Sequence, residues 1–428
     1  MTASVSTPWI GCIADDFTGA SDLASFLVAS GMRTIQVNGV PSADQLRSYS
    51  GFDALVIALK SRTAPVADAI DESLKSLAAL QARGCRKFYF KYCSTFDSTA
   101  QGNIGPVIDA LLAALGESST VLCPALPING RTVYQGHLFV FNQLLHESPM
   151  KDHPLTPMRD SSLVRLIEAQ GSGKAISIAH AELEAGEERL AAVLTQAAEK
   201  YRYLVVDAVS EANLRTLGHV LSNFKLVTGG SGLALDLCHE FEALGFERKP
   251  SGAALSGLQA PALILSGSCS AMTQRQVAHY RDQAPSVQLD PLLVANGEQS
   301  VELISAWLRE HRDAAPLVYA TASAEDVAKA HTILGKSQTQ CLVEDTFAAL
   351  AQAALGMGFR NIVAAGGETS GAVVKALDVR AFEIGRSIAP GVPMVRTIGG
   401  EPLNLALKSG NFGRERFFSD AVEALTCT

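Results

Sequence analysis

The fold is indicated first by the stretch Ile13-Ala14-Asp15-Asp16-Phe17-Thr18-Gly19-Ala20. The apolar residues 9–13 before it are typical of a buried strand, and the apolar spacing of residues 21–27 after it favours a helix. Two carboxylates, a hydroxyl and a glycine therefore lie on a strand-to-helix turn, which is where open α/β sheets bind ligands.

This turn has two interpretations. The backbone N–H groups of Thr18 and Gly19 can bind an anion at the start of the helix. Asp15 and Asp16 face opposite ways if the strand continues, so one can enter a site while the other caps the helix. A polar turn with an Asp N-cap and no ligand is the alternative.

Length and charge limit the class of protein. The 428 residues exceed one ordinary hydrophobic core and predict two or three domains. The formal net charge of −8 argues against a nucleic-acid partner but not against a phosphate ligand, which needs only local donors. No apolar run is long enough to span a membrane, and residues 1–8 lack the features of a signal peptide. We therefore expect a cytoplasmic protein with no membrane partner.

The cysteines and histidines give no sign of a metal centre. The eight cysteines form no C-x-x-C pair, and the nine histidines form no H-x-x-x-H pair. Cysteines among apolar neighbours, such as Cys123, are expected to be small core residues in a reducing compartment. A disulfide framework or a structural zinc site is not expected.

The first half of the chain alternates short apolar runs with longer amphipathic ones. We predict strands at residues 9–14, 34–38, 54–59, 87–91, 120–123 and 203–207. We predict helices at residues 21–30, 66–83, 104–115, 161–169, 182–199 and 210–221, with a further helix at 233–244. The alternation implies a mostly parallel sheet with helices on both faces.

The second half of the chain shows the same alternation of apolar and amphipathic runs after an irregular segment. Residues 245–259 mix charge, proline, glycine and serine without a clear period, which indicates a linker. Further strands are predicted at residues 262–265, 317–320 and 362–365, and a helix at 272–281. The expected architecture is therefore two α/β domains, residues 1–250 and 258–428, each with a mostly parallel sheet flanked by helices.

Polar clusters follow the predicted strands of the first domain. They are residues 15–19, 60–63, 91–99 and 127–132. Because parallel strands end at one edge of a sheet, we expect these clusters to converge on a small, hydroxylated, anionic ligand. Arg62 or Arg131 could hold a carboxylate in bidentate fashion, and Asp16 could take a proton from a substrate hydroxyl. A surface ion pair for Arg62 and a helix cap for Asp97 are the alternatives.

The second domain instead has loops rich in glycine and hydroxyl groups. They are residues 266–270, 366–371, 398–400 and 408–413. Glycine lets backbone N–H groups approach a phosphate closely, and Lys408 could add a positive charge. Neither a P-loop nor a G-x-G-x-x-G fingerprint is present, so tight turns without a ligand are the alternative.

Together these features suggest transfer of a phosphoryl group. One domain suits a polyhydroxy acid and the other suits a polyphosphate, and such chemistry needs positioning, charge neutralisation and a base near the acceptor hydroxyl. Two lobes that close would exclude water, so we expect the active site in the cleft between the domains.

A family resemblance extends over nearly the whole chain. It is carried, in order, by the motifs IADDFTGASD, LKSRT, FYFKYCSTFDSTAQGNIGPV, CPALPINGRTVYQGHLFV, VTGGSGLA, GSCSAMTQRQV, GGETSGAVVKAL and ALKSGNFG. With these motifs the chain resembles the four-carbon acid sugar kinase family, formerly a domain of unknown function. The long uninterrupted matches at residues 88–107 and 123–140 are far more specific than any single glycine loop.

The resemblance implies an N-terminal domain for the acid sugar and a C-terminal domain for the nucleotide. ATP would phosphorylate the terminal 4-hydroxyl of 3-oxo-tetronate, with Mg²⁺ expected to neutralise two phosphates and Glu368 or an aspartate reaching it through water. The catalytic base would be Asp16, or failing that Asp15; the sequence does not separate them. The implied acid-sugar site draws on Thr18, Gly19, Arg62, Lys91, Asp97, Asn129, Gly130 and Arg131. The implied ATP site draws on Ser266, Gly267, Ser268, Gly366, Gly367, Glu368, Thr369, Ser370, Gly399, Gly400 and Gly410.

Other functions stay open at this point. A kinase of threonate or erythronate would need the same groups, and a two-lobed binding protein without turnover would need only the polar clusters. A nicotinamide-dependent dehydrogenase is the weakest alternative because the dinucleotide fingerprint is missing. The metal ligands are not identified, and a homo-oligomer is compatible with the sequence but is not predicted by it.

Overall fold

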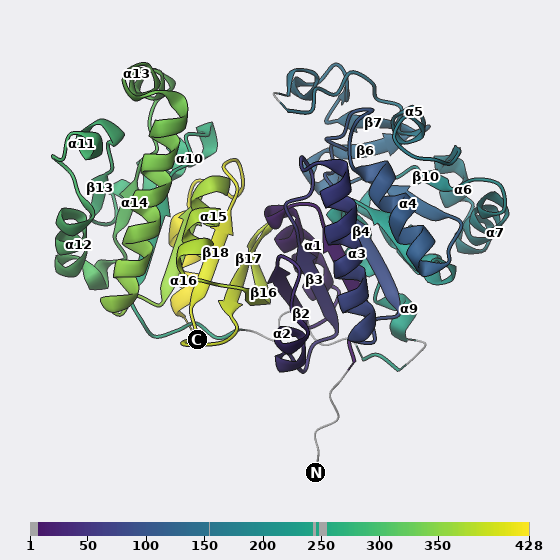
Figure 1. Ribbon diagram of the computed structural model, residues 1–428, viewed down its shortest axis with the longest axis horizontal. Coiled ribbons are helices and arrows are strands. Elements are labelled where there is room, and N and C mark those ends of the chain that lie inside the picture. Colours follow the sequence, from purple (N-terminus) through teal and green to yellow (C-terminus); the bar gives the residue numbers. More distant parts are fainter. Residues whose placement is uncertain (1–6, 154, 243–244, 248–254, 428) are drawn as a thin grey trace, which may run out of the picture. The chain divides into compact units, whose positions relative to one another are not determined.

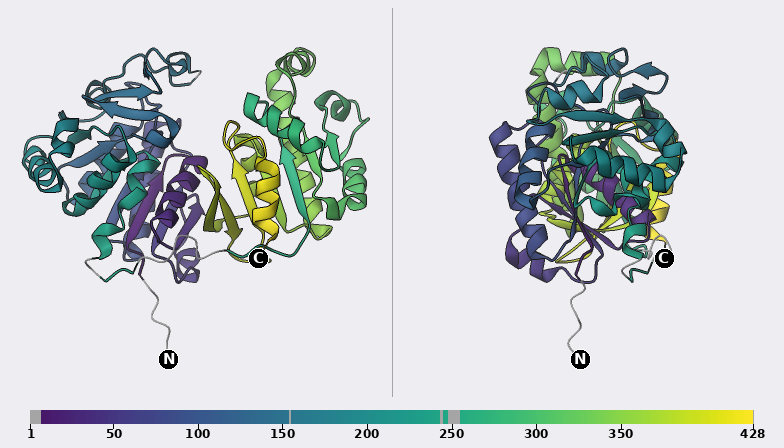
Figure 2. Two further views of the ribbon diagram at one scale, coloured as in Figure 1. Left: turned by 180° about the vertical axis from the view of Figure 1, so that it is seen from behind. Right: turned by 90° about the vertical axis from the view of Figure 1, so that its right-hand side faces the viewer.

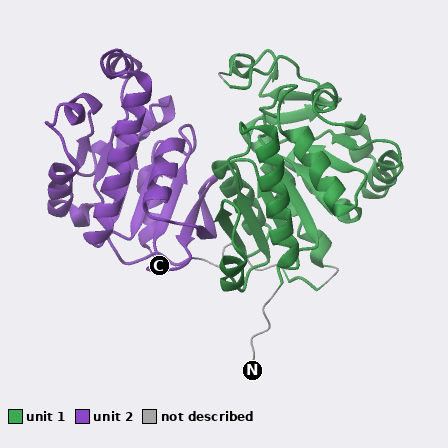
Figure 3. Cartoon of the chain, viewed as in Figure 1, with its two compact units in different colours: residues 1–252 green, residues 253–428 purple. Residues whose placement is uncertain are grey.

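The structure is a computed structural model that describes residues 7–153, 155–242, 245–247 and 255–427. The chain divides into two compact units, residues 1–252 and 253–428 (Figure 3). The expected end of the first domain, residue 250, and residues 248–254 of the expected linker lie outside the described residues.

Unit 1 is built on a parallel sheet. Its strands are β1 (Ile10–Ala14), β2 (Thr34–Asn38), β3 (Ala54–Ala58), β4 (Lys87–Lys91), β5 (Thr120–Cys123), β9 (Ala175–Ile178), β10 (Tyr203–Val206) and β11 (Leu226–Gly229). Their order in the sheet is β2-β3-β1-β4-β11-β5-β10-β9, and neighbouring strands run parallel (Figure 1). The chain leaves β1 toward β2 but leaves β3 toward β4, so the sheet reverses direction beside β1. Such a switch point is the usual ligand position in open α/β sheets.

Helices cover both faces of this sheet. They are α1 (Phe17–Ala29), α2 (Ala43–Ser48), α3 (Val66–Ala82), α4 (Ile104–Leu115), α5 (Leu163–Glu168), α6 (His180–Glu184), α7 (Glu187–Ala198), α8 (Glu211–His219) and α9 (His239–Glu242), with the 3₁₀ helices η1 (Pro127–Asn129), η2 (Pro149–Asp152), η3 (Leu221–Asn223) and η4 (Ser231–Asp236). Right-handed crossovers that run in opposite directions place α1 and α3 on opposite faces. The packing agrees, because α3 contacts α4 while α1 and α8 contact η4.

A small antiparallel sheet, which the sequence did not predict, follows β5. It consists of β6 (Arg131–Tyr134), β7 (His137–Val140) and β8 (Gln143–Leu144) in that order. These strands are short and only partly buried, so they lack the continuous apolar run that marks the strands of the main sheet. The 123–140 motif thus folds as an excursion at the carboxyl end of β5.

Unit 2 also has a mostly parallel sheet. Its strands are β12 (Ala262–Ser266), β13 (Ser286–Gln288), β14 (Leu317–Tyr319), β15 (Asn361–Ala365), β16 (Ala381–Ala389), β17 (Val392–Thr397) and β18 (Asn404–Lys408), in the order β13-β14-β12-β15-β18-β17-β16. β13 to β18 are parallel along this order, whereas β17 and β16 continue the sheet in antiparallel fashion. The expected pair of mostly parallel α/β sheets is therefore confirmed.

The helices of unit 2 form two layers. They are α10 (Ala271–Arg281), α11 (Pro291–Ala295), α12 (Val301–Glu310), α13 (Ala324–Leu334), α14 (Lys336–Gly356), α15 (Gly367–Ala376) and α16 (Phe417–Thr426), with the 3₁₀ helix η5 (Arg312–Ala314). α14 packs against α12, α13 and α15, while α16 packs against α10 and several strands. Seen from behind, α16 (yellow) lies over the sheet of this unit (Figure 2).

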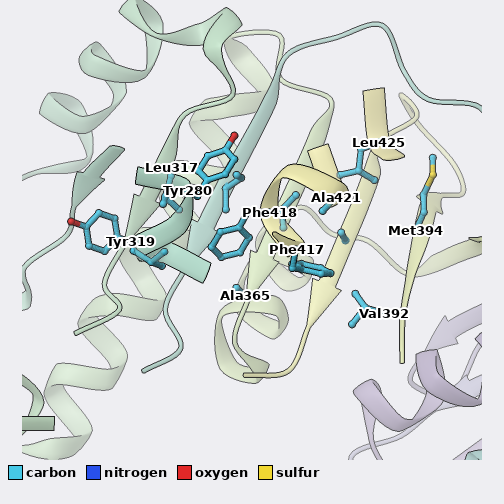
Figure 4. Close-up of a cluster of buried hydrophobic side chains, with 14 of the residues drawn as sticks. Tyr280, Leu317, Tyr319, Ala365, Val392, Met394, Phe417, Phe418, Ala421 and Leu425 are labelled. Atoms are coloured by element: carbon cyan, nitrogen blue, oxygen red, sulfur yellow. The ribbon is translucent and has the colours of Figure 1, made fainter. Parts of the chain in front are cut away.

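The hydrophobic core on the α16 side explains why this helix packs against the sheet of unit 2. Phe417, Phe418, Ala421 and Leu425 recur at helical spacing and are buried against strand residues such as Val363 (Figure 4). Tyr280 of α10 meets Phe418 edge to face, with ring centroids 5.9 Å apart.

Two helix predictions were wrong in detail. The segment 182–199 is divided into α6 and α7 because Gly186 adopts a positive φ of 100° between them. The segment predicted as one helix at 233–244 instead forms η4 and the short α9, and residues 243–244 lie outside the described residues. Among the described helices, none is long and apolar enough to cross a membrane.

His219, the last residue of α8, connects α7 and η4 in unit 1. Its Nδ1 lies 2.8 Å from Oε1 of Glu187 in α7, and its Nε2 lies 2.8 Å from Oδ2 of Asp236 in η4. Burial opposes protonation, but the two carboxylates outweigh it and raise the pKa of His219. The ring of His239, whose Nδ1 contacts Glu242, lies beside it with centroids 4.1 Å apart.

This arrangement predicts a pH-dependent loss of stability. Because the pKa is raised on folding, protonated His219 stabilises unit 1 fully below the pKa of an unfolded histidine, about 6.5, and this contribution disappears as pH rises through the folded value. The unfolding temperature of His219→Gln should fall below that of the unchanged protein at pH 6, and the gap should narrow by pH 8.5. A gap that widened with pH would contradict a charged His219.

Candidate active site

The turn after β1 holds two carboxylates with different surroundings. Asp15 is buried, with a side-chain exposure of 6%, and its backbone N–H donates to the carbonyl of Lys91 at 3.0 Å. Asp16 precedes α1 in extended backbone and keeps a side-chain exposure of 26%. The hydroxyl of Thr18 donates to Oδ2 of Asp16 at 2.9 Å. The predicted strand-to-helix turn thus presents one inner and one outer carboxylate.

Arg62 connects both carboxylates from the loop after β3. Its Nε and Nη2 donate to the two oxygens of Asp15, each at 2.9 Å, and Nη2 also donates to Oδ1 of Asp16 at 2.7 Å. Its Nη1 lies 3.8 Å from Oδ2 of Asp97. The fork geometry of a guanidinium suits this bidentate pairing, which a lysine could not reproduce.

Lys91, the last residue of β4, completes the cluster. Its buried ammonium group lies 3.2 Å from Oδ1 of Asp16. A Cβ atom at Gly19 would lie 1.8 Å from Nζ of Lys91 and 2.2 Å from Oδ1 of Asp16. A side chain at position 19 would therefore shift the ion pair from its present position.

The chain after β4 positions Asp97. Thr95 donates to Oδ1 of Asp97 at 2.6 Å, and Phe96 between them has a left-handed φ of 62°. The buried ring of Phe96 packs edge to face on Tyr92, with centroids 5.6 Å apart. Such a backbone conformation is costly for a bulky residue, and here the packed ring holds it.

These contacts separate the two aspartates electrostatically. Burial raises the pKa of Asp15, despite the opposing effect of Arg62. Burial also opposes ionisation of Asp16, but Lys91 and Arg62 outweigh it and hold the pKa of Asp16 well below its usual range. The same carboxylates raise the pKa of Lys91, although burial alone would lower it. At neutral pH, Asp16 is therefore ionised and Lys91 is charged.

Asn103, which sequence reasoning missed, fixes the loop that carries Arg62. Its buried amide donates to the carbonyls of Ser61 at 2.7 Å and Ala64 at 2.9 Å. The N–H groups of Ser61 and Arg62 in turn donate to the carbonyl of Asp15 at 3.1 and 3.2 Å. The NIGPV segment of the 88–107 motif contains this residue, but nothing in its type identified a positioning role.

The predicted turn Asn129-Gly130-Arg131 lies elsewhere on the same edge, after β5. Gly130 has a φ of 73°, and a Cβ atom there would lie 2.4 Å from the ring of Phe141. The guanidinium of Arg131 stacks over that ring at 5.6 Å and donates to the carbonyl of Asn129. Within the described residues, no hydrogen bond or ion pair joins this turn to the cluster around Arg62.

Unit 2 contains a cavity of about 780 Å³ at the carboxyl ends of its parallel strands. Much of the predicted nucleotide set lines it: Gly267, Ser268, Gly366, Gly367, Glu368, Thr369 and Gly410. Gly366 has a φ of 126°, and a Cβ atom on Gly267 would lie 2.2 Å from Oγ1 of Thr369. The glycines therefore serve close packing of loops around the cavity.

The remaining predicted residues of unit 2 do not line this cavity. The hydroxyl of Ser266 is buried 2.8 Å from that of Thr321, and the hydroxyl of Ser370 donates to the carbonyl of Ala364. Gly399 and Gly400 lie in the turn between β17 and β18. Because β18 begins there and ends at the cavity, the structure places both glycines at the opposite edge of the sheet.

Lys408 binds the loop that contains Gly410 and does not line the cavity itself. Its buried ammonium group donates to Oγ1 of Thr273 at 3.0 Å and to the carbonyls of Ser409 and Gly410 at 3.3 and 2.9 Å. Burial lowers its pKa to about 8. These contacts hold the Gly410 loop against α10, so Lys408 shapes the cavity wall.

Sequence reasoning missed the other half of the cavity. This part is lined by residues 288–292 after β13, by Ala320 and Ala322 after β14, and by residues of α13 and α14. The small and polar residues 321–323 that end β14 were the available signal. The cavity-lining residues of α13 and α14 carried no such signal in the sequence.

A two-unit α/β protein with a carboxylate–cation cluster in one unit and a glycine-lined cavity in the other is organised as a small-molecule kinase. The comparisons agree: a sugar-binding N-terminal domain model matches residues 10–237, and a nucleotide-binding C-terminal domain model matches residues 263–418. The chain belongs to the four-carbon acid sugar kinase family, and it is an ATP-using phosphotransferase with an alcohol group as acceptor.

Individual relatives cover the chain almost completely. Proteins named 3-oxo-tetronate kinase from Burkholderia multivorans and Cupriavidus necator are 49% and 47% identical over 99% and 98% of this chain, and 99% and 97% of their own. A crystal structure from Salmonella typhimurium LT2, provisionally named a tRNA synthase, has a TM-score of 0.90 and 47% identity over 96% of this chain and 98% of that one. A Haemophilus influenzae structure has a TM-score of 0.85 and 46% identity over 97% and 100%.

Proposed function

We propose that the protein transfers the γ-phosphoryl group of ATP to the terminal 4-hydroxyl of 3-oxo-tetronate, giving 3-oxo-tetronate 4-phosphate and ADP. The observation that carries this proposal is that each unit has a site of its own and of complementary chemistry. The cluster around Arg62 suits a small hydroxylated acid, and the glycine-lined cavity suits phosphates. Relatives with this name span the whole chain.

In this proposal Asp16 is the base. Arg62 occupies both oxygens of buried Asp15, whereas the cations contact only Oδ1 of the more exposed, ionised Asp16, and its Oδ2 accepts from the hydroxyl of Thr18. The 4-hydroxyl oxygen attacks the γ-phosphorus, the bond from that phosphorus to the bridging oxygen breaks, ADP leaves, and the hydroxyl proton passes to Asp16. A weakly basic carboxylate suffices, because the hydroxyl becomes acidic as its oxygen bonds to phosphorus.

Arg131 is the more available cation for the substrate carboxylate. The nitrogens of Arg62 already face Asp15, Asp16 and Asp97, whereas Nε of Arg131 has no hydrogen-bond partner within the described chain. Lys91 and Arg62 then stabilise Asp16 and the developing charge near it. Thr18, Gly19 and the 129–131 turn complete the proposed acid-sugar site.

Mg²⁺ belongs to the same proposal. Mg²⁺ commonly binds through one or two carboxylates, phosphates and water rather than in a cage made by the protein. Glu368 fits that pattern, because its exposed carboxylate lines the cavity beside Gly366 and Gly367, and no group of three His, Cys, Asp or Glu side chains elsewhere in the described residues suits a metal ion. Bound there, Mg²⁺ would neutralise phosphate charge during transfer.

Direct transfer also requires both substrates to meet. We therefore propose that the two sites serve a single reaction, and that the protein works where ATP is abundant, in the cytoplasm. The reaction is tested by incubating purified protein with ATP, Mg²⁺ and 3-oxo-tetronate, threonate or erythronate while ADP and phosphorylated product are measured. Faster turnover of threonate or erythronate would overturn 3-oxo-tetronate as the substrate. If none of the three acids yields ADP, the protein would instead be a binding protein without turnover.

Asn103 provides a smaller test of the site. Asn103→Leu removes the amide that donates to the carbonyls of Ser61 and Ala64 and frees the Arg62 loop, so kcat/KM for the acid sugar should fall by about 5- to 150-fold, from ~1–3 kcal/mol. KM for ATP should not change. Asn213→Leu removes a buried capping asparagine of α8 and is the matched control. An equal loss in both variants would assign Asn103 a purely structural role.

A further inference from the structure

Phe141 adopts a backbone conformation that is unfavourable for its residue type. It is the first of two residues in the turn between β7 and β8, because Val140 and Gln143 on either side of the turn pair with each other. Phe141 has a φ of 55°, whereas the φ of Asn142 is not positive. A positive φ at the first central position alone is the pattern of a type II′ turn, where glycine is preferred. A phenylalanine at this position is therefore strained, and such strain is often found at functional sites.

Burial does not explain why this strain is tolerated. The side chain of Phe141 is 70% exposed. Phe96, which has a similar φ of 62°, is instead fully buried, and its ring packs on Tyr92. The hydrophobic core of unit 1 can offset the strain at Phe96 but not the strain at Phe141.

The ring of Phe141 contacts Arg131. The guanidinium carbon of Arg131 lies over this ring, 5.6 Å from its centroid, which is within the range of a cation–π interaction. The backbone supports the contact, because Arg131 pairs with Val140 and the N–H of Phe141 donates to the carbonyl of Gly130 at 2.6 Å. Gly130 also leaves room for the ring, since a Cβ atom there would lie 2.4 Å from it. Strand pairing, the turn and a glycine thus all bring the ring against Arg131.

This contact restricts the guanidinium without using its donors. A ring over the face of a guanidinium leaves the N–H groups, which lie in the guanidinium plane, able to donate. Within the described part of the chain, Nη1 of Arg131 donates to the carbonyl of Asn129, and Nε has no hydrogen-bond partner. The guanidinium is therefore held in place while part of its hydrogen-bonding capacity stays unused.

We propose that Phe141 is a positioning residue for the acid sugar. Its ring, carried by the strained turn, fixes the guanidinium of Arg131 in the orientation that meets the substrate carboxylate. The proposal rests on the proposed function for the carboxylate as the ligand of Arg131. It gives a role to the turn between β7 and β8, which begins directly after the 123–140 motif ends.

Phe141→Gly is the direct test, because glycine suits the turn and removes the ring. The Kd for 3-oxo-tetronate, measured by calorimetry, and its KM should both rise by about 2- to 10-fold, as expected for a lost cation–π contact. The values of kcat and of KM for ATP should stay unchanged, and the unfolding temperature should not fall. Phe141→Tyr keeps an aromatic ring and should bind the acid normally.

Gln135→Gly is the matched control. Gln135 has a φ of 50° in the neighbouring turn between β6 and β7, and its side chain is exposed. This substitution relieves the same kind of backbone strain in the same small sheet, but no interaction within the described residues joins Gln135 to Arg131. Acid binding and turnover should therefore be unaltered.

A double-mutant cycle shows whether Phe141 acts through Arg131. Arg131→Leu should weaken binding of the acid, and the addition of Phe141→Gly should weaken it no further. An additional loss in the double variant would mean that the ring contacts the acid itself and would overturn the positioning role. An unchanged Kd in Phe141→Gly, an equal loss in Gln135→Gly, or normal binding by Arg131→Leu would overturn it as well.

These outcomes are distinct from those of the reaction. If the unchanged protein and its variants bind the acid in the expected pattern but none of the four-carbon acids yields ADP, the positioning role stands and the proposed reaction fails. If 3-oxo-tetronate is phosphorylated equally well by the unchanged protein and by Phe141→Gly, the reaction stands and the positioning role fails.

Discussion

Asp16→Asn is expected to reduce turnover by roughly 10²–10⁴-fold, the range typical of a lost general base, while ATP affinity stays unchanged. The amide cannot accept the proton of the 4-hydroxyl. It also removes the negative charge that Lys91 and Arg62 now face. ATP binds in the other unit, so calorimetry with Mg²⁺–ATP should give the same Kd for both proteins.

The assignment of the base depends on matched variants. Asp44→Asn removes an exposed carboxylate of α2 in the same unit and should leave turnover unaltered. Asp15→Asn keeps the shape of the buried partner of Arg62 and tests the alternative base. Near-normal turnover in Asp16→Asn would remove Asp16 from the mechanism. A loss of turnover confined to Asp15→Asn would assign the role of base to Asp15.

Arg62→Leu should have the second large effect, on stability as well as on activity. Removal of one partner of a buried ion pair leaves an uncompensated charge, which typically costs about 3–5 kcal/mol. Asp15, with a side-chain exposure of 6%, is the group left uncompensated. We expect a markedly lower unfolding temperature for unit 1 at neutral pH. Partial recovery should follow on acidification, since the already raised pKa of Asp15 favours its neutral form.

Arg33→Leu is the control for this change. Arg33 also makes a bidentate pair, with Asp53, but near the amino ends of β2 and β3 and with a side-chain exposure of 34%. Its loss should reduce stability less and should leave kcat and KM unaltered. If both leucine variants lost stability equally and kept activity, Arg62 would be an ordinary structural arginine.

Much of unit 1 could be predicted because its strands are continuous apolar runs. The predicted strands at 87–91 and 120–123 and the helix at 104–115 match β4, β5 and α4 residue for residue. The polar residues after β1, β3 and β4 share one edge because the strands are parallel, which is why Asp15, Arg62 and Lys91 meet as expected. Here local pattern and tertiary structure agree.

The rest depended on information that single segments do not contain. β16 and β17 pair in antiparallel fashion; β16 carries Glu383 and Arg386 at exposed positions and β17 contains Pro393, so neither gave a strong apolar run. Gly399 and Gly400 have positive φ values in the turn that joins β17 to the antiparallel β18, and sequence alone could not distinguish such a turn from a phosphate loop. The part of the cavity that lies after β13 and β14 is assembled from residues far apart in sequence.

Gly19 has a consequence for anyone who wishes to redesign the substrate range. Since the ammonium of Lys91 occupies the volume that a methyl group would need, any side chain at position 19 would shift that ammonium and the nearby carboxylate oxygen of Asp16. A library randomised at positions 19 and 91 would have to find compensating pairs in one step. Libraries built around the 129–131 turn avoid this steric conflict and leave the ion-pair cluster intact.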